Sequence, residues 1–200
     1  MRFACAPALA VCFALACGQA VPNLDSPGRT IVCFGDSLTA GVGRGAGATY
    51  PEHLARLLGV PVVNAGVPGD TASQALRRLD GVLADDPWLV VVELGGNDIL
   101  RRVPLETTEA ALATVVERLL EARVVPLLIE VRGPFGGRHG RLFDRLESRY
   151  GVPVLSDVLP DLLVDRRYKT DAIHLNAAGY ERLAEAVAQR IEPLLRRRAA

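Results

Sequence analysis

The chain has 200 residues, half of them apolar, with 23 basic and 23 acidic side chains and a formal net charge of zero. This length and composition predict one globular domain with a sizeable hydrophobic core. Because the charges balance and no basic face carries interleaved aromatic residues, the sequence offers no electrostatic footprint for nucleic-acid binding.

The first residues are typical of an export signal. Arg2 precedes an uncharged apolar run, Phe3 to Ala16, which is too short for a membrane span of about 20 residues. Two cleavage sites remain open. Ala-Leu-Ala-Cys at 14–17 is similar to a bacterial lipobox, although its first alanine stands where a larger aliphatic residue is more usual. Gly-Gln-Ala at 18–20 would instead suit ordinary signal peptidase and release an unanchored protein.

We favour the lipoprotein interpretation, in which Cys17 is lipidated, because a diacylated terminus gives stable anchoring. Residues 1–20 are then the signal and the start of a tether, and residues 21–29 are a linker. The protein is expected to be exported and periplasmic, and lipidation would anchor it to the membrane. Of the four cysteines, Cys33 alone lies in the predicted domain, without a disulfide partner or metal-ligand spacing, and we expect it in the core.

From residue 30 onward, short apolar runs alternate with helical patterns, as in a parallel sheet covered by helices on both faces. Apolar residues at helical spacing predict one helix over 112–120 and another over 180–191, the latter with an N-cap at Asn176. Pro193 is expected to end or kink this last helix. No repeat, low-complexity tract or second domain is visible, so residues 30–200 form a single α/β domain. The predicted strands are 30–34, 60–64, 88–93, 124–131 and 152–155.

Polar residues follow several predicted strands, and the carboxyl ends of parallel strands meet at one edge of the sheet, where ligands bind. Gly35-Asp36-Ser37 follows the first strand, 64–71 the second and 94–98 the third, while 171–174 lies near the end of the chain. Acyl transfer needs a nucleophile, a base, an orienting acid and donors for the oxyanion. The four turns supply residues of all four kinds.

Three of these residues fit the roles of a catalytic serine system. Ser37 is the candidate nucleophile, His174 the base and Asp171 the carboxylate that orients the base. The other two histidines, His53 and His139, have no acidic residue three positions before them. His174 is therefore the better base, although a hydrogen-bonded structural histidine is the alternative for this position.

Two further residues fit the role of oxyanion donors. Gly69 can present its backbone N–H to a ligand at close range, and Asn97 offers a side-chain amide on a turn that two glycines make tight. Taken singly, each could be only a turn residue, and Asp36 or Ser37 could merely cap the following helix. The joint occurrence of all these residues behind the expected strands favours a catalytic set.

With these blocks the chain resembles the SGNH or GDSL hydrolases, and within them the bacterial periplasmic thioesterase/lysophospholipase and arylesterase branch, from about residue 30 to the C-terminus. Leu175 departs from the family, which often has proline after the histidine, but the Asp-x-x-His spacing is intact. The resemblance implies a three-layer α/β/α, flavodoxin-like domain with five parallel strands in the order 2-1-3-4-5. The family's block residues fall on Ser37, Gly69, Asn97, Asp171 and His174.

The resemblance also implies a serine esterase that hydrolyses carboxylic esters or thioesters of small aryl, acyl or lysophospholipid type through an acyl-enzyme. The oxyanion would be held by the backbone N–H groups of Ser37 and Gly69 and by the Asn97 amide. No metal or organic cofactor is needed for this chemistry. The expected partner is a small-molecule ester, with no role for nucleic acid, and we favour a monomer.

Substrate choice is less well specified by the sequence. Four apolar residues could line an acyl groove, and four arginines could meet an anionic headgroup or face solvent, of which we favour solvent. The apolar residues are Ile99, Leu100, Val103 and Phe135, and the arginines are Arg101, Arg102, Arg132 and Arg138.

Four other interpretations stay open from the sequence. Asp36 could accept phosphate in a signalling receiver, and the glycine-rich run 41–46 could bind a dinucleotide. Asp36, Asp98 and His174 could hold a metal ion, although no helical ligand pair supports this. The strongest alternative is a catalytically silent exported lipoprotein that binds lipid or glycan in the same pocket.

Overall fold

The computed structural model of the protein describes residues 21–132, 138–156 and 158–199. Five strands and nine α-helices are assigned in these ranges, with one short 3-10 helix at Arg166–Tyr168. The strands are β1 (Thr30–Gly35), β2 (Val62–Gly66), β3 (Pro87–Glu93), β4 (Val125–Ile129) and β5 (Val154–Leu155). The helices are α1 (Ser37–Ala40), α2 (Tyr50–Leu58), α3 (Ala72–Leu76), α4 (Leu79–Leu83), α5 (Gly96–Leu100), α6 (Leu105–Glu121), α7 (Arg138–Tyr150), α8 (Val158–Val164) and α9 (Ala177–Arg198).

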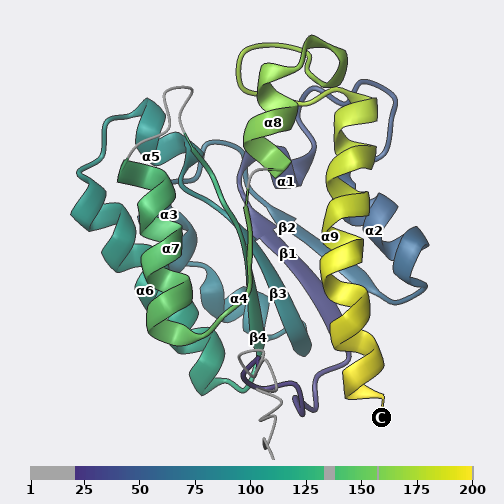
Figure 1. The fold of residues 1–200 in the computed structure, drawn as a ribbon, viewed down its shortest axis with the longest axis vertical. Coiled ribbons are helices and arrows are strands. Elements are labelled where there is room, and N and C mark those ends of the chain that lie inside the picture. Colours follow the sequence, from purple (N-terminus) through teal and green to yellow (C-terminus); the bar gives the residue numbers. More distant parts are fainter. Residues whose placement is uncertain (1–20, 133–137, 157, 200) are drawn as a thin grey trace, which may run out of the picture.

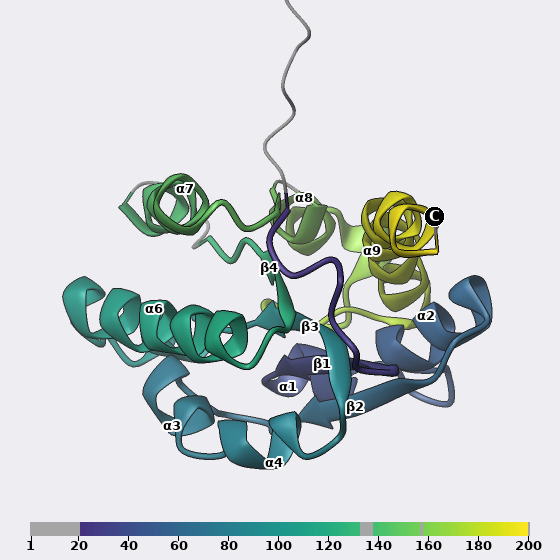
Figure 2. The ribbon, with the colours of Figure 1, turned by 90° about the horizontal axis from the view of Figure 1, so that it is seen from below.

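The strands form one parallel sheet in the order β2-β1-β3-β4-β5. Helices α2 and α9 cover one face, and α3, α4, α6 and α7 cover the other (Figures 1 and 2). The predicted single α/β domain, with three layers and this strand order, is confirmed. In Figure 1 the carboxyl ends of the strands point upward, toward α1, α5 and α8.

The strand boundaries differ from the predicted ones where proline interrupts a run of apolar residues. β2 begins at Val62, two residues later than predicted, because Pro61 has no N–H to donate. It ends at Gly66, beyond the apolar run, where Gly66 pairs with Gly35 at the end of β1. β5 is likewise shorter than predicted and begins after Pro153.

The core lies on both sides of β3, the central strand, all seven residues of which are buried. Its largest fully buried side chains include Trp88, Tyr50, Tyr180 and Phe34. Burying one large apolar side chain contributes about 1.5–3 kcal/mol, so this cluster fixes the sheet on which the site is built. Cys33 is buried in the core as predicted, and burial raises the pKa of its thiol to about 12.

The last helix begins as predicted and ends later than predicted. The Asn176 side chain caps α9 by accepting a hydrogen bond from the Gly179 backbone N–H at 3.0 Å. Pro193 does not end the helix, which continues to Arg198. Ile191 and Leu194 are buried on either side of the proline. Their packing offsets the loss of the one helical hydrogen bond that a proline cannot donate. Local sequence rules consider only this loss and therefore predict that the helix ends.

Residues 21–29 contain no helix or strand, yet they are held against the domain at the amino ends of the strands (Figure 1). The Asn23 amide donates to the carbonyls of Leu120 at 2.9 Å and Val124 at 3.3 Å. Arg198, from the end of α9, donates to the carbonyls of Ser26 and Gly28 and stacks over Trp88. The expected cleavage and lipidation positions, including Cys17, lie outside the described residues.

None of the helices in the described part of the chain combines the length and the apolar character needed to cross a membrane.

Candidate active site

The turn after β1 presents Ser37 at the carboxyl edge of the sheet. Asp36 is the N-cap of α1, and its Oδ1 accepts from the Leu38 backbone N–H at 3.1 Å, so the helix-cap interpretation of Asp36 is confirmed. A Cβ on Gly35 would lie 2.1 Å from Thr39 Oγ1 and 2.5 Å from the Glu93 carbonyl. Only glycine fits at this position. It lets the end of β1 pack closely against Thr39 and Glu93, and this packing fixes the position of Ser37, the first residue of α1.

The structure brings Ser37, His174 and Asp171 into one hydrogen-bonded chain. His174 Nε2 lies 3.1 Å from Ser37 Oγ, and His174 Nδ1 lies 2.8 Å from Asp171 Oδ2. The serine and the histidine are 137 residues apart in the sequence. The loop after the 3-10 helix thus places the predicted base next to the predicted nucleophile.

Asp171 is oriented by local hydrogen bonds rather than by burial. Its Oδ1 accepts from the backbone N–H groups of Ile173 at 2.8 Å and His174 at 2.9 Å, and half of its side chain is exposed (52%). The hydrogen bond to His174, followed by that from Ile173, lowers the pKa of Asp171 to about 2. Leu175, which replaces the family's usual proline, is fully buried and pairs with Lys169 across the base of the loop.

The two predicted oxyanion donors lie on the turns after β2 and β3. Gly69 has a φ of +85°, which favours glycine, and its carbonyl accepts from Arg101 at 2.7 Å. The Asn97 amide nitrogen donates to Asp36 Oδ2 at 2.8 Å and to the Asp70 carbonyl at 3.1 Å. Both amide hydrogens of Asn97 are therefore engaged within the protein, and they tie the β2 turn to the β1 turn.

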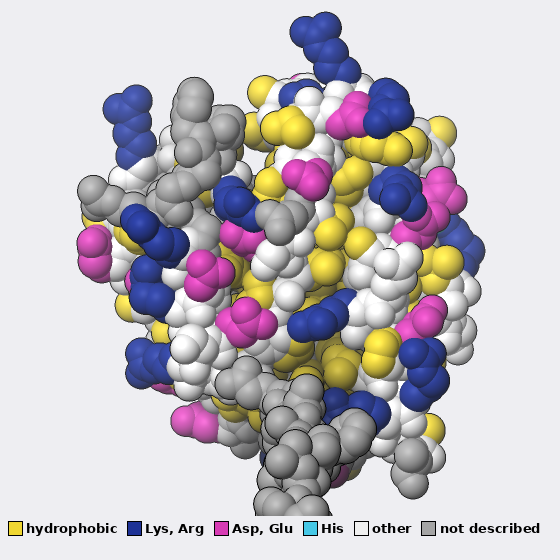
Figure 3. Space-filling view, in the orientation of Figure 1, with side chains coloured by type: hydrophobic (Ala, Val, Ile, Leu, Met, Phe, Trp, Pro, Cys, Tyr) yellow, Lys and Arg dark blue, Asp and Glu magenta, His cyan; other side chains and the backbone are white. Residues whose placement is uncertain are grey.

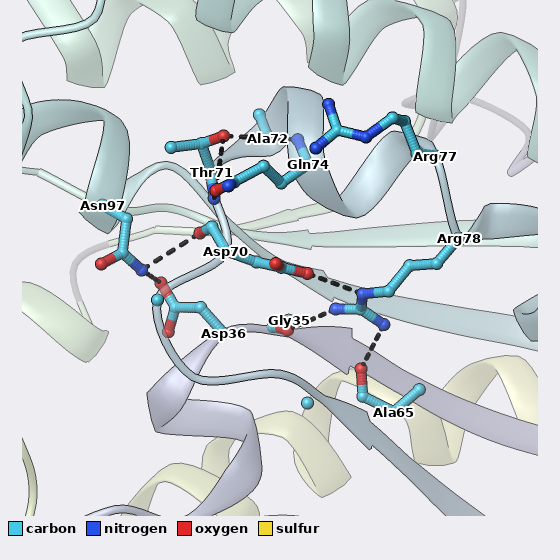
Figure 4. A network of polar contacts seen from close by, with 12 residues as sticks. Gly35, Asp36, Ala65, Asp70, Thr71, Ala72, Gln74, Arg77, Arg78 and Asn97 are labelled. Carbon is cyan, nitrogen blue, oxygen red and sulfur yellow. Dashed lines mark hydrogen bonds and ion pairs between the residues drawn. The ribbon is translucent and has the colours of Figure 1, made fainter.

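Arg78 binds three of these segments together, as Figure 4 shows. Its Nε donates to Asp70 Oδ2 at 2.6 Å, while its two terminal nitrogens donate to the carbonyls of Ala65 at 2.7 Å and Gly35 at 2.8 Å. The guanidinium also stacks on the Phe34 ring, 4.6 Å from its centre. One side chain thus holds the ends of β1 and β2 against the loop that carries Gly69.

A cavity of about 420 Å³ opens beside Ser37 between α5 and α8. Apolar side chains around α8 at the top of the molecule border an indentation in the space-filling view (Figure 3). Of the predicted groove residues, Ile99 and Leu100 line this cavity and Val103 does not, while Phe135 lies outside the described residues. The apolar lining that the sequence did not single out is Val131, Pro160, Leu163, Val164, Ala172 and Ile173.

The predicted arginines divide between the cavity and its surroundings. Arg132 lies in the cavity wall, whereas Arg101 is exposed and holds the Gly69 carbonyl. Arg102 is exposed outside the cavity. The side chain of Arg138 lies outside the described part of the structure. Most of the lining is apolar, so the cavity fits the acyl part of a substrate better than a charged headgroup.

The comparison with known proteins identifies the family. Residues 33–182 match the GDSL-like lipase/acylhydrolase family. The chain belongs to this family. It is 33% identical over 176 residues to thioesterase 1/protease 1/lysophospholipase L1 of Escherichia coli K12, a match that covers 83% of this chain and 85% of the relative. Esterase TesA of Pseudomonas aeruginosa is 32% identical over 180 residues, covering 84% and 90%.

A solved structure agrees with this GDSL assignment. The crystal structure of a protein named TesA superimposes with a TM-score of 0.76 at 29% identity, covering 83% of this chain and 99% of the other. The resemblance inferred from the sequence motifs is confirmed. As a member of the GDSL family, the chain is a carboxylic ester hydrolase of the serine type.

The geometry of this GDSL hydrolase argues against three of the alternatives. Asp36 is only 3% exposed and both its oxygens are engaged, so it does not present an accessible phosphate acceptor. The run 41–46 follows α1 rather than β1, out of place for a dinucleotide-binding turn. Asp98 accepts from the Ala72 backbone and from Thr108, away from the proposed metal partners.

The described residues and the relatives do not support a metal site or a catalytically silent binding protein. No group of three or more metal-ligating side chains is found among the described residues. The relatives reported above are all named for hydrolytic activities, which does not favour a catalytically silent protein.

Two buried acidic residues, Asp36 and Glu93, lie behind Ser37, and the sequence motifs singled out only Asp36. Glu93 ends β3 with no exposed surface, and its Oε2 accepts from Thr39 Oγ1 at 3.0 Å. Burial raises the pKa of both Asp36 and Glu93, and the negative charge of Asp36 raises that of Glu93 further, well above its ordinary value. An acidic residue at the end of an otherwise apolar strand was the available clue, since such a residue is rarely buried without a specific role. Arg78 gave no comparable clue.

Proposed function

We propose that the chain hydrolyses esters or thioesters with an apolar acyl group by way of an acyl-enzyme on Ser37. The observation that carries the proposal is the continuous arrangement of Ser37 Oγ, His174 and Asp171, at 3.1 Å and 2.8 Å, beside an apolar cavity of about 420 Å³. A nucleophile, its base and the group that orients the base must be in hydrogen-bond reach for this chemistry.

In the first half of the reaction, His174 takes the Ser37 proton as the oxygen attacks the acyl carbonyl. Asp171 accepts from His174 Nδ1, which leaves Nε2 as the nitrogen that faces the serine. The imidazolium that forms then gives its proton to the leaving alcohol or thiol. In the second half, a water activated by His174 attacks the acyl-enzyme and releases the acid.

The negative oxygen of each tetrahedral intermediate would be held by the backbone N–H groups of Ser37 and Gly69 and by the Asn97 amide. Removing one such donor costs about 3–4 kcal/mol of the barrier reduction. Asn97 keeps its 2.8 Å contact with Asp36 and exchanges the longer contact, 3.1 Å to the Asp70 carbonyl, for the substrate oxygen. Substrate binding therefore loosens one restraint on the β2 turn.

The apolar cavity favours substrates whose acyl part is longer than acetyl. Its walls come from α5, α8 and the loop that carries His174. The loop that holds the catalytic base therefore also contacts the acyl chain. The names of the relatives include thioesterase, lysophospholipase, esterase and arylesterase, and they support esters and thioesters as the substrate class. A series of p-nitrophenyl esters of increasing chain length would rank these options.

We also propose that the protein is exported to the periplasm and anchored through Cys17. The apolar run behind Arg2 and the lipobox-like residues 14–17 support this. Mass spectrometry of the mature N-terminus is the test. A lipidated Cys17 is expected, and an unmodified chain beginning at Val21 would remove the anchor.

Labelling with a fluorophosphonate probe, followed by peptide mapping, tests the catalytic assignment. We expect one adduct, on the peptide that contains Ser37, and none after the change Ser37→Ala. The variant Ser73→Ala, on α3 away from the cavity lining, is a matched control that should label as the native chain does. An adduct on another residue, or undiminished turnover by Ser37→Ala, would refute the proposal.

A further inference from the structure

Glu93 is a fully buried carboxyl group with too few donors for a charged state. It lies at the end of β3, and the Thr39 hydroxyl satisfies Oε2. Its Oε1 accepts no hydrogen bond from any described residue. A buried carboxylate oxygen without a donor is costly, whereas the same oxygen as a hydroxyl needs only an acceptor. The position of this oxygen therefore indicates a group that carries a proton.

The acceptor for that proton is Asp36, whose side chain is within hydrogen-bond reach of the Glu93 side chain. Asp36 already receives the Leu38 backbone N–H and the Asn97 amide, two donors that favour its charged form. Glu93 has the Thr39 hydroxyl and the Asp36 backbone N–H, but burial and the charge of Asp36 raise its pKa more than these donors lower it. Two neighbouring buried carboxyl groups do not both ionise, and the proton stays on the one whose surroundings favour its charge less. Asp36 is thus the anion of the pair and Glu93 the acid.

Packing keeps the two groups together. A Cβ on Gly35 would lie 2.9 Å from Glu93 Oε2 and 2.1 Å from Thr39 Oγ1, so even the smallest side chain would displace this contact. The Tyr50 hydroxyl oxygen lies 3.4 Å from Thr39 Oγ1. Gly35 and Thr39 therefore hold Glu93 Oε2 in place.

The remaining titratable groups around the pair are neutral or lie on the far side of Asp36. Tyr50 from α2 and Tyr180 from α9 are close enough to Glu93 to sense its charge, Cys33 from β1 contacts Tyr50, and burial raises the pKa of each of the three groups. His174 acts on Asp36 across Ser37, where a positive charge stabilises the Asp36 anion. No described cation faces Glu93 closely enough to stabilise a second negative charge.

We propose that Glu93 is a positioning residue for the hydrolysis, held as a neutral acid that donates a hydrogen bond to Asp36 and so fixes the Asn97 amide at the oxyanion site. The inference rests on the proposed function of Ser37 and Asn97. It adds a line of contacts from the interior to the reacting atoms: Thr39 to Glu93, Glu93 to Asp36 and Asp36 to Asn97. Loss of the proton sets two anions against each other and displaces the Asn97 donor.

Two substitutions separate the hydrogen bond from the packing. In Glu93→Gln the amide still donates to Asp36 and its carbonyl still accepts from Thr39, so we expect kcat within about threefold of the native value. Glu93→Leu keeps most of the volume but has no donor, and we expect kcat to fall roughly 10- to 100-fold, as when a catalytic group is misplaced. KM should change less than about twofold, because Glu93 does not line the cavity.

The pH dependence gives a readout that a purely structural role would not produce. At alkaline pH the native enzyme should lose kcat as Glu93 ionises, and Glu93→Gln should not show this loss. The native protein should also lose stability as pH rises above about 4.3, since the unfolded chain releases a proton that the folded chain retains. Glu93→Gln should flatten this slope. Asp98→Asn, a control at a buried carboxylate with two donors, should leave the slope as it is.

Infrared spectroscopy observes the proton directly and does not depend on turnover. At neutral pH the native protein should show the C=O band of a protonated carboxyl group, and Glu93→Gln should lack it. Absence of this band, an unchanged pH slope in Glu93→Gln, or full kcat in folded Glu93→Leu would each overturn the inference. If Ser37→Ala kept its turnover, the proposed function would fail while the infrared result still decided the state of Glu93.

Discussion

The two halves of the active site are held by different means. The nucleophile half, with Ser37, Asp36 and Glu93, is built on the ends of buried strands, and Asp36 is only 3% exposed. The base half is a surface loop in which 52% of the Asp171 side chain is exposed and hydrogen bonds between near neighbours supply the order. We infer that changes at the buried residues of the first half affect stability and catalysis together, whereas changes in the second half affect catalysis with little effect on stability.

The largest effect is expected from removing the proposed nucleophile. Ser37 belongs to the first half and contacts His174 in the second half, so this change affects both. Ser37→Ala should lower kcat for a p-nitrophenyl ester by roughly 10⁴- to 10⁶-fold. The melting temperature should stay near the native value, since the change removes one hydroxyl beside an open cavity. Ester hydrolysis and thermal denaturation on the same preparation measure the two quantities.

Asp171→Asn tests the surface loop alone. We expect kcat to fall roughly 10²- to 10⁴-fold because the imidazole loses the partner that fixes its tautomer. The folded pKa of Asp171, about 2, lies below the value of about 3.9 for an unfolded chain. Because half of the side chain is exposed, solvent screens its contribution to stability, which is therefore small; the contribution is complete above about pH 4 and is lost as pH falls toward 2. A stability difference between native and Asp171→Asn that persisted at pH 2 would contradict this.

Arg78→Met tests the interior half without touching the reacting atoms. Four contacts are lost, to Asp70, Ala65, Gly35 and the Phe34 ring. We expect a destabilisation of about 1–3 kcal/mol, which lowers the melting temperature by roughly 2–10 °C. The kcat should fall about 10-fold as the Gly69 loop loosens. Arg77→Met, on the exposed side of the same segment, is the control. An equal loss of stability and kcat there would contradict the role given to the Arg78 contacts.

The smallest effect is expected at the cavity wall, where only substrate length should matter. Leu163→Trp fills part of the cavity and should lower kcat/KM for a long-chain ester about 10-fold while the acetate ester changes much less. Leu57→Trp adds the same ring at an exposed position on α2 and should leave the chain-length profile unchanged. A uniform loss across all chain lengths in Leu163→Trp would remove the cavity as the acyl site.

The sequence predicted the parts of the molecule that local blocks encode. The turn after β1, the Asn97 turn and the Asp-x-x-His spacing each carry their residues within a few positions, and the structure brings Ser37, Asp171 and His174 together. The strand order came from the family resemblance and is confirmed. Of the two outcomes predicted at Pro193, an end or a kink, the end was wrong, because α9 continues to Arg198 with packed residues on either side of the proline.

The supporting residues could not be found in the same way because their partners are distant in the sequence. Arg78 contacts Gly35, 43 positions away, and Glu93 contacts Thr39, 54 positions away. Helices α5 and α8, which line the same cavity, are likewise far apart in the sequence. Such contacts leave no periodicity or short motif in the sequence. The reacting groups could therefore be predicted from the sequence, and the groups that hold them in place could not.

Residues 21–29 are fixed to the domain at the end of the sheet opposite the proposed active site. Cys17 lies six positions before Asn23, the residue that is fixed to the domain, so a lipid on Cys17 would be within a reach of about 20 Å of that point. That point lies at the amino ends of the strands, and β3 alone extends about 20 Å toward the opposite end. If Cys17 is lipidated as proposed, the anchor holds the amino end of the sheet, rather than the catalytic edge, nearest to the bilayer.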